Sequence, residues 1–172
     1  CATPASRARG LGMNWDSRAA ASRPFRSLLA VPSPSGASLE IAARHAPGAD
    51  AIAAVEVRTY ATVKSHFSST DVDTTMAARL SVPYCVAAAL VDGEVTQAQF
   101  RPDRFRDDAV RQVMARVRII ADDRLTALYP EKFPAQVSVR LQDGTTLVAE
   151  RHYPKGDPSD PLSDAELLDK FH

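Results

Sequence analysis

The sequence has few of the residues that build disulfide or metal frameworks. It contains two cysteines, Cys1 and Cys85, and Cys85 lies in an apolar run where a buried free thiol is expected. The four histidines fall in different predicted elements with no two at metal-ligand spacing, and no Cys-x-x-Cys or His-Glu-x-x-His motif occurs. We therefore predict no metal site and no redox centre.

Long hydrophobic runs and an excess of one charge are also missing. The longest apolar stretches, such as Val86–Val91, are far shorter than the ~20 residues of a membrane-spanning helix. Lys+Arg and Asp+Glu both number 21, so the formal net charge is +0, which does not fit a nucleic-acid-binding surface. We expect a cytoplasmic protein that binds neither membrane nor nucleic acid.

Glycine-rich cofactor motifs are absent as well. Among only 7 glycines there is no Gly-x-Gly-x-x-Gly run, no Walker loop and no Gly-x-Ser-x-Gly elbow, so we predict no cofactor. What is present is ordinary: 172 residues with 45% hydrophobic and 24% charged side chains are typical of one soluble globular domain.

The first part of the chain differs in composition from the rest. Ala, Ser, Arg, Pro and Gly supply 27 of the first 38 residues, Asp16 is the only acid there, and apolar periodicity is missing. The chain also opens on Cys1 rather than methionine and closes within a predicted first helical turn. We expect a piece of a longer protein, with a loosely ordered joining segment over 1–37 and a folded domain over 38–172.

Four segments have helical periodicity or capping signals: 39–45, 77–89, 107–116 and 163 onward. Ser38 is the predicted N-cap of the first. Ser81 can cap the small-residue helix, which Gly93 should end. The last begins with the capping box Ser163-Asp164-Ala165-Glu166.

Strand patterns occur at 54–60, at 116–121 and on both sides of Asp143-Gly144, which predicts a tight hairpin between 136–141 and 145–150. The polar segment 64–73 is predicted to be a loop. The order helix, strand, two helices, three strands, helix predicts an α+β fold with a small, mostly antiparallel sheet packed with helices.

Tyr84 is the main candidate for binding chemistry. It lies near the start of the small-residue helix, where backbone N–H groups and a phenol could together meet a carboxylate. The alternative is a core tyrosine. His66 could serve as a general base, although a polar loop favours a solvated histidine. The residues alone identify no activity.

The run Ser81–Gly93, SVPYCVAAALVDG, closely resembles the Ser-Leu-Pro-Tyr-x-Val-Ala-x-Ala-Leu-x-x-Gly stretch of the MmgE/PrpD family, which includes 2-methylcitrate dehydratase and cis-aconitate decarboxylase. The resemblance continues in order over about 39–172, through these further segments: 107–110, 116–122, 143–144, 155–158 and 161–167. Upstream, Leu11-Gly12 with Trp15 and then Arg23-Pro24-Phe25 are similar to family motifs.

The resemblance implies a large all-helical domain and a smaller α+β lid, with the active site between them and no metal or organic cofactor. This chain corresponds to the lid. Family reactions remove or rearrange groups next to carboxylates on small di- and tricarboxylic acids, which requires a base and cations. Two catalytic residues carry over: Tyr84, at the tyrosine of the helix motif, and Arg23, at the lysine of a Lys-Pro-aromatic-Pro motif.

The chain departs from the family after Phe25, where proline and a nearby histidine or cysteine are expected. Residues 26–36 contain neither histidine nor cysteine. We interpret the stretch between Phe25 and Ala37 as a family motif altered by a local frame slip or by decay. Reading the coding DNA in its other frames tests this hypothesis. A family-like Pro-x-x-His or Asp-Ala string supports it, and its absence contradicts it.

Three functions fit the resemblance. The chain is the lid of a dehydratase-like lyase that needs its helical domain, supplied upstream or by a second chain. Alternatively, it is a non-catalytic remnant or an oligomerising module, with exposed apolar area on the small-residue helix. The third function is isomerisation or epimerisation of a dicarboxylate. The family's tendency to dimerise predicts a homodimer.

Overall fold

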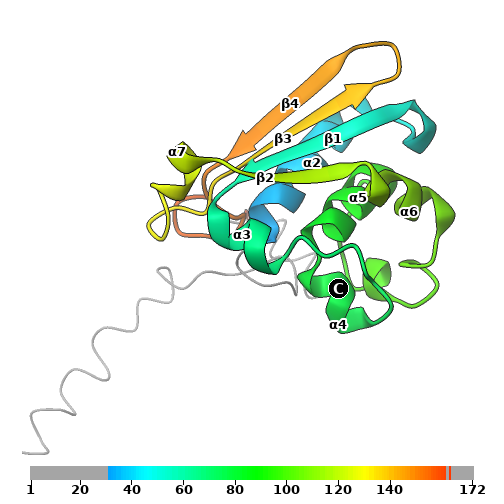
Figure 1. Ribbon diagram of the computed structural model, residues 1–172, viewed down its shortest axis with the longest axis horizontal. Helices are drawn as coiled ribbons and strands as arrows, with labels where there is room; N and C mark the ends of the chain where they lie inside the picture. The colour runs from blue at the N-terminus through cyan, green and yellow to red at the C-terminus, as the bar shows by residue number, and fades with distance from the viewer. Residues whose placement is uncertain (1–30, 162, 164–172) are drawn as a thin grey trace, which may run out of the picture.

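The computed structural model describes residues 31–161 and Ser163 (Figure 1). Its α-helices are α2 (Pro32–His45), α3 (Ala61–His66), α4 (Thr75–Leu80), α5 (Val82–Asp92), α6 (Asp108–Ala115) and α7 (Asp123–Thr126). Two 3₁₀ turns, η1 (Ala49–Ala51) and η2 (Ala98–Phe100), lie between them. The strands are β1 (Ile52–Thr59), β2 (Val117–Ala121), β3 (Ala135–Leu141) and β4 (Thr146–Arg151).

The four strands form one sheet in the order β2-β1-β3-β4. β3 pairs antiparallel with both β1 and β4, and the predicted hairpin at Asp143-Gly144 is confirmed, with Gly144 at φ +89°. β1 and β2 are parallel, because the helices between them return the chain to the end of the sheet at which β1 begins. The α+β class is confirmed, with a mixed sheet.

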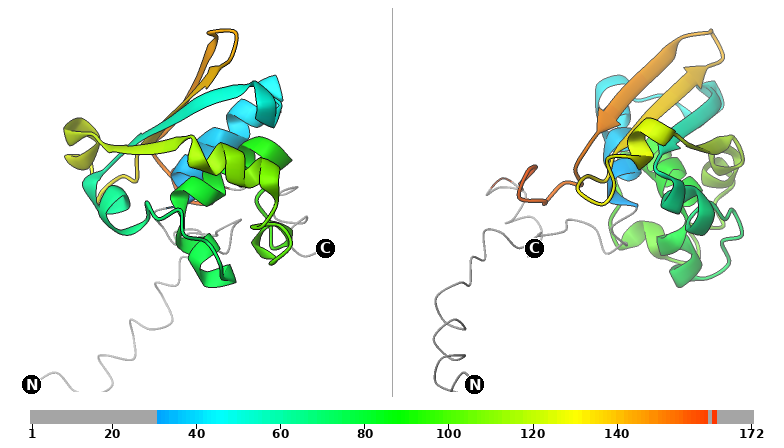
Figure 2. Two further views of the ribbon diagram at one scale, coloured as in Figure 1. Left: turned by 45° about the vertical axis from the view of Figure 1, so that its right-hand side comes forward. Right: turned by 60° about the vertical axis from the view of Figure 1, so that its left-hand side comes forward.

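The helices α2, α5 and α6 lie together on one side of the sheet (Figure 2). Side chains that point to this side are buried, among them Val55 and Val57 of β1 and Val137 and Val139 of β3. Every residue of α5 from Val82 to Leu90 is buried. Its alanines are small enough for close contact with α2 and α6, which makes α5 the centre of the helical layer.

The helix predicted over 77–89 is two helices, α4 and α5, which are separated at Ser81. The cap and the end that the sequence predicts for it are confirmed for α5, and the helix predicted over 107–116 is confirmed as α6. The Ser81 hydroxyl accepts a hydrogen bond from the Tyr84 N–H at 3.1 Å, and Gly93 ends α5 with φ +70°. Asp107 caps α6 by accepting from the N–H groups of Ala109 and Val110. These local signals position the helix that carries Tyr84.

The first helix begins earlier than the sequence indicates. Since α2 starts at Pro32, Ser38 is not an N-cap; its hydroxyl lies inside the helix and donates to the Pro34 carbonyl at 2.9 Å. Val31 and Ala37 are buried, so residues 31–37 pack with the core, and the expected boundary between 37 and 38 falls within α2. Proline, serine and glycine there suggested a loop, but proline suits a first helical turn and burial supplies the stability.

Two other expectations differ or lie elsewhere. The predicted loop 64–73 is wrong at its start, since α3 extends through His66 and Val63 anchors it in the core. Of the predicted helix from Ser163 onward, all but Ser163 lies outside the described residues.

Candidate functional site

Tyr84 lies in the first turn of α5, and its side chain points into the helical layer. The residue is 1% exposed, and its phenol O–H donates a hydrogen bond to the backbone carbonyl of Gln99. The Phe100 ring packs at a tilted angle with its centroid 6.1 Å away. Burial is the main cause that raises the pKa of Tyr84 above its ordinary value, so the phenol stays protonated at neutral pH.

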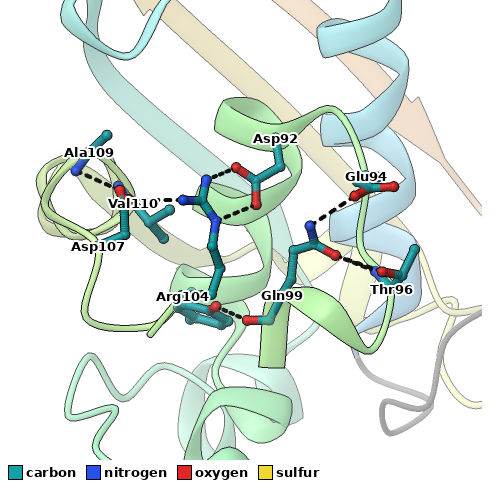
Figure 3. Close-up of polar contacts among 9 residues, drawn as sticks. Asp92, Glu94, Thr96, Gln99, Arg104, Asp107, Ala109 and Val110 are labelled. Atoms are coloured by element: carbon teal, nitrogen blue, oxygen red, sulfur yellow. Dashed lines mark hydrogen bonds and ion pairs between the residues drawn. The ribbon is translucent and has the colours of Figure 1, made fainter. Parts of the chain in front are cut away.

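The loop that follows α5 is closed on itself by the side chain of Gln99 (Figure 3). The Gln99 Oε1 accepts hydrogen bonds from both the N–H and the hydroxyl of Thr96, each at 2.9 Å. Its Nε2 donates to Glu94 at 3.1 Å. The Gln99 carbonyl that accepts the Tyr84 hydrogen bond therefore belongs to a loop fixed by three side-chain hydrogen bonds.

Arg104 joins the end of α5 to the start of α6. Its guanidinium forms a bidentate pair with Asp92, with Nε 2.9 Å from Oδ2 and Nη2 on Oδ1, and its Nη1 donates to Asp107 at 2.8 Å (Figure 3). The Asp92 side chain is 8% exposed. The hydrogen bond that Arg104 donates to Asp92 is the main cause that raises the pKa of Arg104 above its ordinary value. Arg104 thus offsets a buried carboxylate at the negative end of α5.

The polar groups around Tyr84 are satisfied by one another. The Ser81 hydroxyl accepts from the first turn of α5 and donates to the Ser69 carbonyl at 2.6 Å, so the cap residue occupies the helix start. Tyr84 bonds a backbone carbonyl, and Arg104 is engaged by two carboxylates. In this arrangement the Tyr84 network stabilises structure, and the role of Tyr84 with an acid stays a prediction.

The other sequence candidates lie apart from this network. Arg23 falls outside the described residues, so its predicted role stays a prediction. His66 is exposed at the end of α3, with Nδ1 2.8 Å from the Ser65 hydroxyl, and fits the solvated interpretation. Cys85 is a buried free cysteine whose pKa is raised by burial.

Residues 31–161 hold no group of three or more His, Cys, Asp or Glu side chains that could bind a metal ion. No helix within the same described residues has the length and apolar character to span a membrane.

Sequence reasoning missed an ionic cluster at the end of β4. Arg151 pairs with Glu40 of α2 at 3.1 Å and with Asp160 at 3.0 Å, and Lys155 lies 3.5 Å from Asp160. The cluster holds the turn at 155–158 against the sheet and α2. No local sequence pattern predicts this ionic cluster, because Glu40 is far in the sequence from Arg151, Lys155 and Asp160.

A four-stranded mixed sheet with a layer of helices on one side, centred on the Ser81-capped α5, defines an α+β domain. The model of the MmgE/PrpD C-terminal domain family matches residues 36–172. This chain therefore belongs to the MmgE/PrpD family, and the resemblance read from Ser81–Gly93 is confirmed. A comparison with curated proteins finds no match.

Proposed function

We propose that this chain is the lid part of a 2-methylcitrate dehydratase-like lyase that acts on small di- or tricarboxylic acids. In this proposal the reaction begins with removal of a proton next to a carboxylate, and it requires a helical domain from another segment or a second chain. The observation that carries the proposal is the match to the family's C-terminal domain over residues 36–172.

The bonding around Tyr84 supports the need for a partner. Proton abstraction beside a carboxylate needs a base and cations that hold the acid. Arg104, the cation that joins α5 to α6, is already engaged by Asp92 and Asp107. A base and acid-binding cations would therefore come from the helical domain, with Arg23 adding the lid's own positive charge.

Tyr84 can take part in this reaction as a neutral hydrogen-bond donor. Its raised pKa keeps the proton on the phenol at neutral pH, where it could stabilise the negative charge that develops on a substrate carboxylate. The phenol now bonds to the Gln99 carbonyl. Its part in the reaction therefore requires the phenol to exchange the Gln99 carbonyl for a substrate oxygen.

The second candidate is a folded remnant or oligomerising module without catalysis. The specific observation that favours it is the burial of Tyr84, since a phenol bonded to a backbone carbonyl behaves as a core group. Under this alternative the Tyr84 network has only a structural role.

Turnover with and without the missing domain tests the proposal. The purified chain and the helical domain of a MmgE/PrpD lyase are assayed with 2-methylcitrate, separately and mixed, by the ultraviolet absorbance of the unsaturated acid formed. We expect turnover only in the mixture, reduced by Tyr84→Phe and unchanged by Tyr129→Phe, a matched variant at a half-exposed tyrosine. A stable complex without turnover contradicts the lyase and favours the remnant.

A further inference from the structure

The face of the sheet opposite the helices carries a group of arginines. Arg118 on β2 and Arg140 on β3 alternate in sequence with the buried Val117 and Val139, so they point away from the helical layer. Both arginines are exposed. The chain as a whole has formal net charge +0, so this grouping is a local feature.

A hollow of about 650 Å³ lies on this face and touches all four strands. Short side chains form its floor: Ala54 of β1 is the register partner of Arg140, and Ser138 of β3 is the partner of Glu56. Longer side chains of the neighbouring strands rise around them. Arg118 and Arg140 stand on opposite sides of β1, beside Glu56 and Ala54 respectively. Two strand spacings across and two residues along the strand place their backbones roughly 12 Å apart.

The arginines of the hollow have free donors. Arg118 and Arg140 make no hydrogen bond or ion pair with any residue of the described chain. Arg116 also lines the hollow, and its Nη1 is held by the backbone carbonyls of Ala49 and Ile52 at 3.2 and 2.6 Å. This fixes one guanidinium in place, so less side-chain entropy is lost when its other N–H groups bind.

Negative charge at the hollow is already compensated. Glu56 is the one acid among the described lining residues, and its Oε1 accepts a hydrogen bond from the Arg58 Nε at 2.7 Å. Three arginines therefore face a floor of small neutral side chains with no unpaired carboxylate between them. Such an arrangement attracts anions and repels cations.

We propose that this hollow binds a small anion that carries two or more carboxylate or phosphate groups. Guanidinium groups bind both oxyanions through paired N–H bonds, and arginines on either side of β1 suit a ligand with a charge at each end. The volume falls within the roughly 300–1,000 Å³ typical of small-molecule sites. The outward-pointing side chains that line the site lie on the opposite face of the sheet from α5, so the inference is independent of the proposed function.

Amide NMR on the complete 172-residue chain locates the binding directly. Citrate and pyrophosphate are titrated separately at low ionic strength, which distinguishes carboxylate from phosphate ligands. We expect saturable shifts at Ala54, Ser138 and Arg140 with at least one of them, while the amides of α5 stay unchanged. The double variant Arg118→Ser/Arg140→Ser should bind at least about tenfold more weakly, since charge-assisted hydrogen bonds are lost.

Arg106→Ser is the matched control, because Arg106 is an exposed arginine outside the hollow. It should bind citrate and pyrophosphate as the unchanged chain does, and all variants should keep the dispersed amide spectrum of a folded domain. Absence of saturable binding, shifts centred elsewhere, or equal weakening by Arg106→Ser overturns the proposal. Binding of a glutamate-rich peptide but of neither small anion also overturns it, in favour of an acidic protein partner.

Discussion

Arg151 and Glu40 lie 111 residues apart in the sequence, yet the Arg151 Nη2 is 3.1 Å from the Glu40 Oε2. The pair joins the last strand, β4, to the first described helix, α2. Arg151 also binds Asp160, and its side chain is only 28% exposed, so water screens these charges less than at the surface. The Arg151 guanidinium thus links the first described helix to the segment that follows the last strand.

Loss of this guanidinium should destabilise the domain. Arg151→Ala removes both ion pairs and leaves Glu40 and Asp160 facing a poorly hydrated region, so we expect a loss of about 1–2 kcal/mol in the free energy of unfolding. Urea denaturation followed by circular dichroism measures it. Arg124→Ala is the control, because the Arg124 side chain is 86% exposed and should contribute below about 0.5 kcal/mol. Equal effects of the two substitutions contradict the proposed role of Arg151.

Ser81 should contribute to stability through its cap. Ser81→Ala removes the acceptor of the Tyr84 N–H and the donor to the Ser69 carbonyl, for an expected loss of about 1–2 kcal/mol. Ser81→Thr keeps the hydroxyl and should recover most of it. Ser65→Ala, at an exposed hydroxyl in α3, should have little effect. Thermal unfolding compares the variants, and no difference between Ser81→Ala and Ser65→Ala contradicts the cap.

Tyr84→Phe separates stability from function at the same position. The substitution removes the O–H that satisfies the Gln99 carbonyl and should cost about 1 kcal/mol of stability, because the ring and its packing against Phe100 remain. In the active mixture, the decrease in kcat/KM caused by Tyr84→Phe is converted to a free energy. We expect that free energy to exceed the loss of stability. Equal losses in stability and turnover make Tyr84 a core residue only.

Cys85 should be chemically silent in the folded domain. Burial raises its thiol pKa, and because the thiolate is the reactive form, raising the pH to mildly alkaline values should not label it. Unfolding returns the pKa to its ordinary range and exposes the thiol. Alkylation with peptide mass spectrometry should therefore detect modified Cys85 in urea but not in buffer. Rapid labelling in buffer contradicts the buried site.

Local signals predicted local structure well. The Ser81 cap, the end of α5 at Gly93 and the Gly144 turn were readable because a few neighbouring residues determine each of them. The start of α2 was not, since it depends on the burial of Val31, just before the helix, and of Ala37 within it, in a core that the sequence does not display. The parallel pairing of β1 with β2 depends on how the intervening helices return the chain.

The candidate site was predictable only in part. The family motif identified Tyr84, but nothing near it in the sequence shows that its phenol bonds to the Gln99 carbonyl. The arginines of the outer sheet face were missed for a similar reason. Arg118 and Arg140 belong to separate strands, and only the strand order places them on either side of β1.

The most direct test of the lyase proposal follows the Tyr84 ring and amide by NMR while citrate is added, first to the chain alone and then with the helical domain. Tyr84 is bonded internally in the chain alone, so we expect its signals to move only when the helical domain is present, together with turnover of 2-methylcitrate. Shifts confined to Ala54, Ser138 and Arg140 in both samples would report the outer-face site and leave Tyr84 uninvolved. A stable complex in which Tyr84 does not respond to citrate contradicts the account.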